Sequence, residues 1–129
     1  MFLGRNIAPA QGDGAMLRPK NKKGFSMKNF RCYTLSVEVY AKAEKAVVPN
    51  HLRQQLLRAA SSIVLNLAEG WGRQSPADRR HFFTIAFGSV RECQAIAQLA
   101  LCNRGTSQTT LANDLDKLAA YIYRLLHPR

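Results

Sequence analysis

The sequence predicts an all-α protein, an antiparallel up-down-up-down four-helix bundle. Apolar residues recur at helical spacing over four segments, and short stretches rich in glycine, proline and capping residues separate these segments. Strand-like alternation is absent from the sequence, and short connections favour antiparallel neighbours. With 129 residues, 47% of them hydrophobic, the chain is long enough for one domain with one modest core.

The first helix is expected over about 31–47. Its apolar stripe repeats every four residues and consists of Leu35, Val39, Ala43 and Val47. The segment "VVPN" ends this helix, because Pro49 disfavours helical geometry at Val48 and suits the start of the next helix.

The second helix, over about 50–72, carries two parallel stripes. The apolar stripe is suited to close helix packing and consists of Leu56, Ala59, Ile63, Leu67 and Gly70. The polar stripe beside it consists of Arg58, Ser62, Asn66, Glu69 and Arg73. One interpretation is a hydrogen-bonded network in which Glu69 pairs with Arg73 or with an arginine of another helix or subunit. The other is a row of phosphate-binding donors. The network is favoured for Glu69, because its carboxylate would repel a nucleic-acid backbone.

The segment "AEGWGRQSPADRR", residues 68–80, is interpreted as a corner between two helices. Ser75 is placed to cap the third helix, Pro76 to occupy its first position, and Asp78 to meet the positive end of its dipole. Gly70 and Gly72 either let the second helix end or allow another backbone to approach closely. A phosphate-binding loop is not favoured, because no strand precedes the glycines and no GxxxxGK[ST] motif is present. Trp71 is expected to pack against a neighbouring helix.

The third and fourth helices are expected over about 76–103 and 108–126. The apolar face of the third comprises Phe83, Ala86, Phe87, Val90, Cys93, Ala97 and Ala100. The segment "NRGTSQ" ends it. The seam of the fourth comprises Leu111, Leu115, Leu118, Ile122 and Leu125.

The formal charge of +11 is spread unevenly. Residues 1–31 hold seven basic side chains against one acidic side chain. We interpret residues 1–29 as a flexible basic tail and 30–127 as the bundle. Met27 is a candidate natural start, and whether residues 1–26 belong to the native protein stays open. A secretory signal and a bilayer-spanning apolar run are both absent from the sequence, and the three cysteines form no motif. These features predict a cytoplasmic location without membrane association.

Residues 54–93 resemble the bacterial 23S rRNA-intervening sequence proteins. The matching motifs are a QL-R-AA-SI-N-AEG-GR run and an IA-GS-E segment, formed here by Gln55, Leu56, Arg58, Ala59, Ala60, Ser62, Ile63, Asn66, Ala68, Glu69, Gly70, Gly72 and Arg73, then by Ile85, Ala86, Gly88, Ser89 and Glu92. The resemblance extends more weakly over 30–126. The chain departs from the family pattern in a shorter connection before the second helix, and in Tyr40 where a tryptophan is common.

The resemblance carries implications beyond fold. Similar bundles include the accessory variability determinant of diversity-generating retroelements, a basic pentameric barrel that binds nucleic acid and a reverse transcriptase. The resemblance therefore implies a homopentamer with a nucleic-acid role and, by distant analogy, a reverse-transcriptase partner.

No catalytic residue, cofactor or metal site is expected. His51, His81 and His127 lie in different segments and form no metal-binding pair. Helical-bundle ribonucleases use an arginine closely followed by a histidine, and neither Arg73 with His81 nor Arg124 with His127 fits that pattern. A ribonuclease is therefore the least favoured function. Whether His81 and Cys93 have a role stays open.

Two functional classes stay open. The favoured one is a basic oligomer that binds structured RNA or duplex DNA through candidate arginines, namely Arg58, Arg73, Arg79, Arg80, Arg91 and Arg104. Paired nucleic acid is favoured because the aromatic residues that could stack single-stranded bases are dispersed. The alternative is a protein-interaction scaffold. Phosphate binding weakens steeply with salt, whereas apolar docking does not, so salt dependence separates the two classes.

Overall fold

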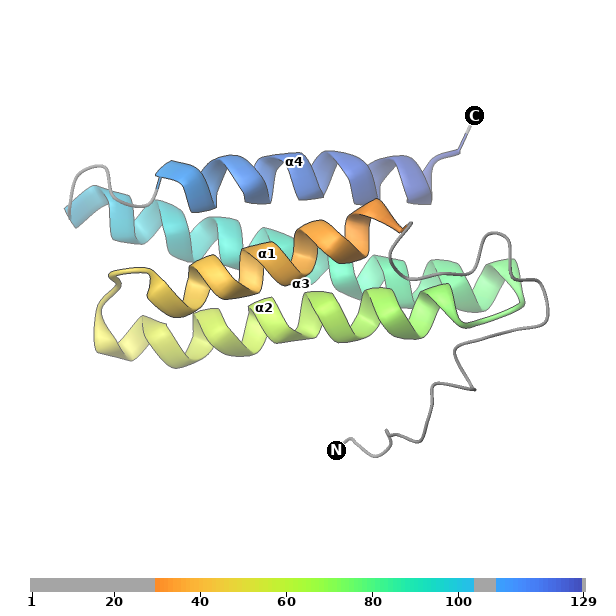
Figure 1. The fold of residues 1–129 in the computed structure, drawn as a ribbon, viewed down its shortest axis with the longest axis horizontal. Coiled ribbons are helices and arrows are strands. Elements are labelled where there is room, and N and C mark those ends of the chain that lie inside the picture. Colours follow the sequence, from red (N-terminus) through yellow and green to blue (C-terminus); the bar gives the residue numbers. More distant parts are fainter. Residues whose placement is uncertain (1–29, 104–108, 129) are drawn as a thin grey trace.

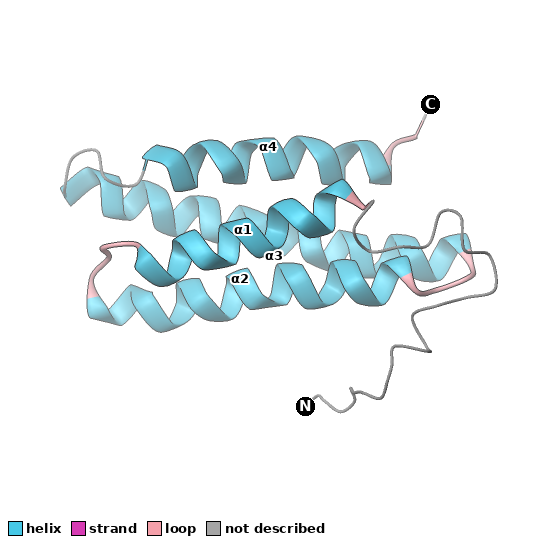
Figure 2. Ribbon diagram, in the orientation of Figure 1, coloured by secondary structure: helices cyan, strands magenta, loops and turns pink. Residues whose placement is uncertain are grey.

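Four antiparallel helices make up the part of the chain that the computed structural model describes, residues 30–103 and 109–128 (Figure 1). They are α1 (Arg31–Lys45), α2 (Asn50–Trp71), α3 (Pro76–Asn103) and α4 (Thr109–Leu126). Each helix packs against the next one in the chain, and α4 also packs against α1, which closes the bundle. The described residues contain no strand (Figure 2), so the predicted all-α bundle is confirmed. Within these residues, no helix combines the length and hydropathy that crossing a bilayer requires.

The end of α1 differs from the prediction. The helix ends at Lys45, and Ala46 adopts an extended conformation with ψ of 145°. Val47, predicted to continue the buried stripe, is therefore 53% exposed, whereas Leu35, Val39 and Ala43 are buried. Val48 precedes a proline and must be extended, so the chain leaves the helix ahead of it.

The core is built from the predicted apolar faces of all four helices. Every member of the apolar stripe of α2 is buried. In α3, Phe87 is only partly buried, and Ile96 joins the core instead. In α4, Leu126 is more deeply buried than Leu125. Helices α3 and α4 each contact two neighbouring helices. A helix with two neighbours buries a wider face than one narrow seam, so residues beside the predicted seam also become buried.

The corner between α2 and α3 has the predicted capping pattern and close packing. The backbone N–H of Asp78 donates to Ser75 Oγ at 3.0 Å. A Cβ atom on Gly70 would lie 2.7 Å from Phe83 Cε1, so only glycine permits this approach. Trp71 stacks on Phe30 with ring centroids 4.1 Å apart. The tryptophan therefore joins α2 to the start of α1, which confirms its predicted packing role.

Candidate nucleic-acid interface

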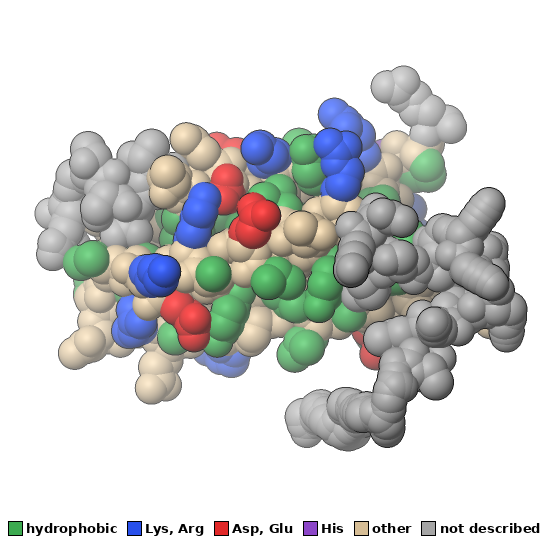
Figure 3. All heavy atoms as spheres, viewed as in Figure 1, with side chains coloured by type: hydrophobic (Ala, Val, Ile, Leu, Met, Phe, Trp, Pro, Cys, Tyr) green, Lys and Arg blue, Asp and Glu red, His purple; other side chains and the backbone are tan. Residues whose placement is uncertain are grey.

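One end of the bundle gathers five arginines, four from α1, α3 and α4 and one from the connection between α2 and α3. Because the helices alternate in direction, α1 and α3 begin where α2 and α4 end (Figure 1). We call this region the basic end and define it by Arg31, Arg73, Arg79, Arg80 and Arg124. On the face drawn in Figure 3, basic side chains gather where α1 begins and α4 ends. The first turn of α1 contains no acidic residue, so its helix dipole adds to the positive potential.

Arg73 and Arg79 hold the α2–α3 corner. Arg73 Nη2 donates to Glu69 Oε2 at 2.7 Å, which confirms the expected pairing. The same guanidinium lies over the Phe82 ring, 4.9 Å from its centroid. Arg79 Nε donates to the backbone oxygen of Arg73 at 2.8 Å. These contacts orient both guanidinium groups and leave further N–H donors for a ligand.

Arg80 connects α3 to the end of α4. Its Nη1 donates to the backbone oxygen of Leu126 at 2.6 Å. Carbonyl groups in the last turn of a helix have no partner within the helix, and a cationic donor there also favours the dipole. Arg80 therefore acts as a cap for α4, a contact between residues 46 positions apart that helical spacing could not reveal.

Arg31 and Arg124 border a small groove between α1 and α4. The groove has a volume of about 200 Å³, and Tyr121 lies in its wall. The Arg31 guanidinium carbon lies 5.5 Å from the centroid of the Tyr121 ring, a cation–π contact. The described residues that line this groove include no carboxylate. Two exposed guanidinium groups beside one groove can hold an anion such as a phosphate.

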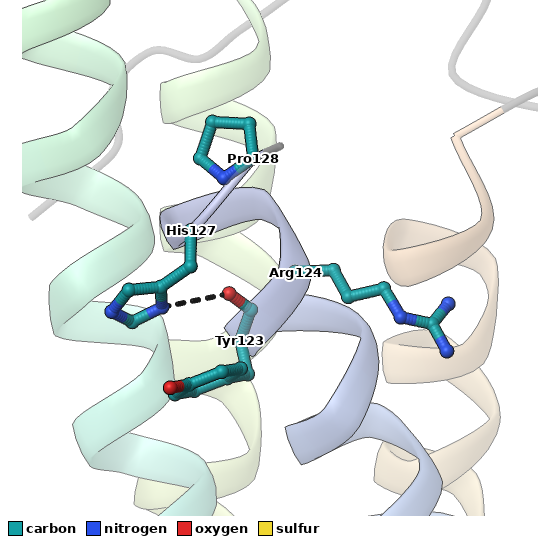
Figure 4. Close-up of a pocket in the computed structure, with 4 residues that line it drawn as sticks. All are labelled: Tyr123, Arg124, His127 and Pro128. Atoms are coloured by element: carbon teal, nitrogen blue, oxygen red, sulfur yellow. Dashed lines mark hydrogen bonds between the residues drawn. The ribbon is translucent and has the colours of Figure 1, made fainter.

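Tyr123 and His127 form an exposed aromatic pair on α4. Their ring centroids are 4.1 Å apart, and the ring planes differ by 27°. His127 Nδ1–H donates to the backbone oxygen of Tyr123 at 3.0 Å, which orients the imidazole (Figure 4). Arg124 extends from the same helix in the opposite direction, towards α1 (Figure 4). An i, i+4 aromatic pair is visible in the sequence, but its exposure is not.

The polar stripe of α2 does not form one continuous network. Asn66 Nδ2 donates to the backbone oxygen and to Oγ of Ser62, at 2.9 and 3.1 Å. Ser89 Oγ of α3 donates to Ser62 Oγ at 2.9 Å. Arg58 is exposed, and its guanidinium makes no hydrogen bond or ion pair to a described residue. Because Ser62 is already engaged by Asn66 and Ser89, Arg58 is left facing solvent.

The remaining candidate arginines do not meet at the basic end. Arg91 lies in the middle of α3, where its Nη1 donates to Gln94 Oε1 at 2.9 Å. Gln94 in turn donates to Asp116 of α4 at 2.8 Å, so this chain of contacts connects two helices. Arg58 lies midway along α2, and Arg104 falls outside the described residues. Arg31 and Arg124 were both absent from the candidate set predicted from the sequence, because only the fold brings them to one groove.

The histidines and cysteines show no catalytic arrangement within the described residues. His81 meets the Phe82 ring edge-on at 5.1 Å, while His127 stacks on Tyr123. Burial raises the pKa of the Cys32 thiol to about 11 and that of Cys93 to about 12. Both thiols are therefore protonated near neutral pH and are poor nucleophiles. The side chains that the structure describes, those of residues 30–100 and 110–128, contain no group of three or more histidine, cysteine or acidic residues that could hold a metal ion.

A comparison with protein families matches residues 29–127 to one family model, described as 23S rRNA-intervening sequence protein. The match covers α1 to α4 and the connections between them. Significant matches were found neither among curated proteins nor among solved structures.

Proposed function

The chain belongs to the 23S rRNA-intervening sequence protein family, and on that premise we propose that it is a non-enzymatic oligomer that binds nucleic acid through its basic end. Structured RNA and duplex DNA are the proposed ligands, because both present closely spaced phosphates. Backbone contacts of this kind position a protein on nucleic acid without reading its sequence.

The observation that carries this proposal is the convergence of five arginines at one end. Only two acidic residues, Glu69 and Asp78, lie in the adjoining turns of α2 and α3, and Glu69 is already paired with Arg73. Arg31 and Arg124 make no ion pair with a described residue. Their charge is therefore available to phosphates.

We propose that subunits meet through the outer α2–α3 face, defined here by Leu65, Ile85 and Gly88. Leu65 is 64% exposed and Ile85 40% exposed. Leu65 lies three residues from Ser62, and Ile85 four residues from Ser89, and these serines hydrogen bond across the two helices. A Cβ on Gly88 would have no heavy atom within 4 Å, so this exposed glycine leaves room for a second backbone. A homopentamer is the proposed assembly, following the family resemblance.

The proposal of a non-enzymatic role has support from the buried thiols and the separated histidines. A nucleophilic cysteine needs a lowered pKa and a neighbouring base, whereas burial raises the pKa of Cys93 to about 12. Acid–base catalysis needs a positioned partner for the histidine. His81 has an aromatic neighbour instead.

Fluorescence anisotropy with an RNA hairpin and a DNA duplex over a salt series tests nucleic-acid binding. We compare the full chain with a chain shortened to start at Met27, which separates the bundle from residues 1–26. Each phosphate contact contributes about −0.9 to the slope of log K against log salt on duplex DNA. The double variant Arg31→Gln/Arg124→Gln should therefore flatten the slope by about 2 per engaged subunit.

Arg58→Gln/Arg91→Gln is the matched control, because it removes the same charge from outside the basic end. If both double variants flatten the slope of log K against log salt equally, net charge alone drives binding and the basic end has no special role. If the shortened chain binds neither ligand, the bundle does not bind nucleic acid by itself.

A protein-interaction scaffold is the second candidate function. The exposed apolar residues of the outer α2–α3 face favour it, since such surfaces serve heterologous partners as well as identical subunits. Binding that persists at high salt, together with a monomeric protein in light scattering, would support this alternative.

A further inference from the structure

The Tyr123–His127 pair is a stack of two exposed aromatic rings that the core does not use. Tyr123 is 53% exposed, and His127 is exposed as well. Neither ring belongs to the hydrophobic core or to the partly buried residues packed against it. The ring of Phe87 in α3 lies farther from Tyr123 than His127 does, with its centroid 6.4 Å from that of Tyr123. The hydrogen bond from His127 to the Tyr123 backbone holds the two rings together in advance of any ligand.

Arg124 lies between this aromatic pair and the groove beside Arg31. It borders the hollow of about 640 Å³ that Tyr123, His127 and Pro128 also line. It also borders the groove of about 200 Å³ beside Arg31. Among the described residues, neither lining contains a carboxylate, so these residues place no fixed negative charge beside an anionic strand in either hollow. The rings and the guanidinium lie on opposite flanks of α4 (Figure 4).

From this arrangement we infer that the basic end binds an unpaired stretch of nucleic acid, with a base stacked on the Tyr123–His127 pair and a backbone phosphate between Arg31 and Arg124. The inference rests on the nucleic-acid binding proposed above and adds the structural class of the ligand. The preferred ligand is a structured RNA or duplex DNA that carries unpaired nucleotides at its end or in a loop.

The aromatic pair specifies an unpaired base because the faces of paired bases are covered by their neighbours in a duplex. Unstacked bases instead bind aromatic side chains, whatever their sequence. A helix with its side chains is about 10–12 Å across. The base and the phosphate therefore belong to different nucleotides of one strand, which crosses the outer surface of the last turns of α4.

A pair of RNAs matched in nucleotide number tests the inference. One is a blunt duplex, and the other is a shorter duplex with single-stranded overhangs, so that the total phosphate charge is similar. Anisotropy with the full chain should show about tenfold tighter binding to the overhang duplex. The same pair in DNA should give the same preference, because stacking and phosphate contacts are shared by both nucleic acids.

Variants of the aromatic pair assign the preference to these two side chains. Tyr123→Leu/His127→Leu should bind both RNAs with equal affinity, because leucine has no face for base stacking. Tyr123→Phe keeps the ring and should keep the preference. Arg124→Gln should weaken binding of both RNAs, since it removes a phosphate contact. Circular dichroism verifies that each variant is folded, which the exposure of both positions favours.

The outcomes distinguish this inference from the proposed function. Equal binding of both RNAs by the unmodified protein would overturn the inference and leave the proposed function in place. A preference that survives in Tyr123→Leu/His127→Leu would also overturn it, because the base would then be stacking elsewhere. Binding of neither RNA would overturn both.

Discussion

Replacing Gly70 and Gly88 with alanine should change stability in opposite directions. Both residues lie inside helices, where alanine is favoured over glycine by about 1 kcal/mol per residue. They differ in their surroundings. A methyl group on Gly70 would lie 2.7 and 2.9 Å from two Phe83 ring carbons and 3.1 Å from Phe82 Cβ. A methyl group on Gly88 would meet nothing within 4 Å.

Relaxation around Gly70 is restricted on both sides. The Phe83 side chain is only 6% exposed and lies against Phe30, with centroids 6.0 Å apart. Phe82 Cβ is attached directly to the backbone and cannot rotate away. Overpacking of this kind typically costs about 1–3 kcal/mol, which exceeds the gain in helix propensity. We therefore expect Gly70→Ala to lose about 1 kcal/mol of stability, and Gly88→Ala to gain about 1 kcal/mol at concentrations where the protein is monomeric.

Urea and thermal unfolding, followed by circular dichroism at several protein concentrations, measures both variants. A difference of about 2 kcal/mol corresponds to roughly 10 °C in Tm for a domain of this size. If Gly70→Ala is as stable as Gly88→Ala, then α2 and α3 do not approach as closely as the structure has them. At higher concentrations the proposed subunit contact over Gly88 should reverse the gain, so the stability of Gly88→Ala relative to the unmodified protein should fall as concentration rises.

Three further changes test the basic end and the core. Ser75→Ala should cost about 1 kcal/mol in thermal unfolding, because Asp78 N–H loses its capping acceptor. Arg80→Gln should cost about 1 kcal/mol and speed hydrogen exchange in the last turn of α4, because the bond to Leu126 is lost. Burial raises the folded-state pKa values of Cys32 and Cys93 to about 11 and 12. As pH rises, these thiols therefore ionise at a lower pH in the unfolded chain than in the folded protein. The contribution of these thiols to the free energy of unfolding should therefore be constant below about pH 9 and decrease above it. Urea titrations at several pH values should show a smaller decrease for Cys32→Ala/Cys93→Ala than for the unmodified protein.

Interactions between residues close together in the sequence account for the helices and their caps. The spacing of apolar residues in α2 and the Ser75-Pro76 signal depend on neighbours within a few positions, so they could be read directly from the sequence. Val47 was predicted wrongly because its periodicity matched the stripe of α1, while Pro49 two residues later governed the backbone. Where apolar spacing predicts that a helix continues but a following proline disfavours helical geometry, the proline decides where the helix ends.

The candidate site was only partly predictable, for a physical reason. The pairing of Glu69 with Arg73 spans four residues of one helix and follows from helical geometry. The contact of Arg80 with Leu126 and the shared groove of Arg31 and Arg124 require the helices to be assembled. Helical periodicity relates only residues on the same helix.

The sequence by itself thus determined four helices, their apolar faces, the α2–α3 corner and the excess of positive charge. Only the tertiary structure decided which charges lie together. Alternating helix direction brings the start of α1 to the end of α4, and it leaves Tyr123 and His127 exposed beside Arg124. Burial and proximity are properties of the packed bundle, since they depend on which surfaces the neighbouring helices cover.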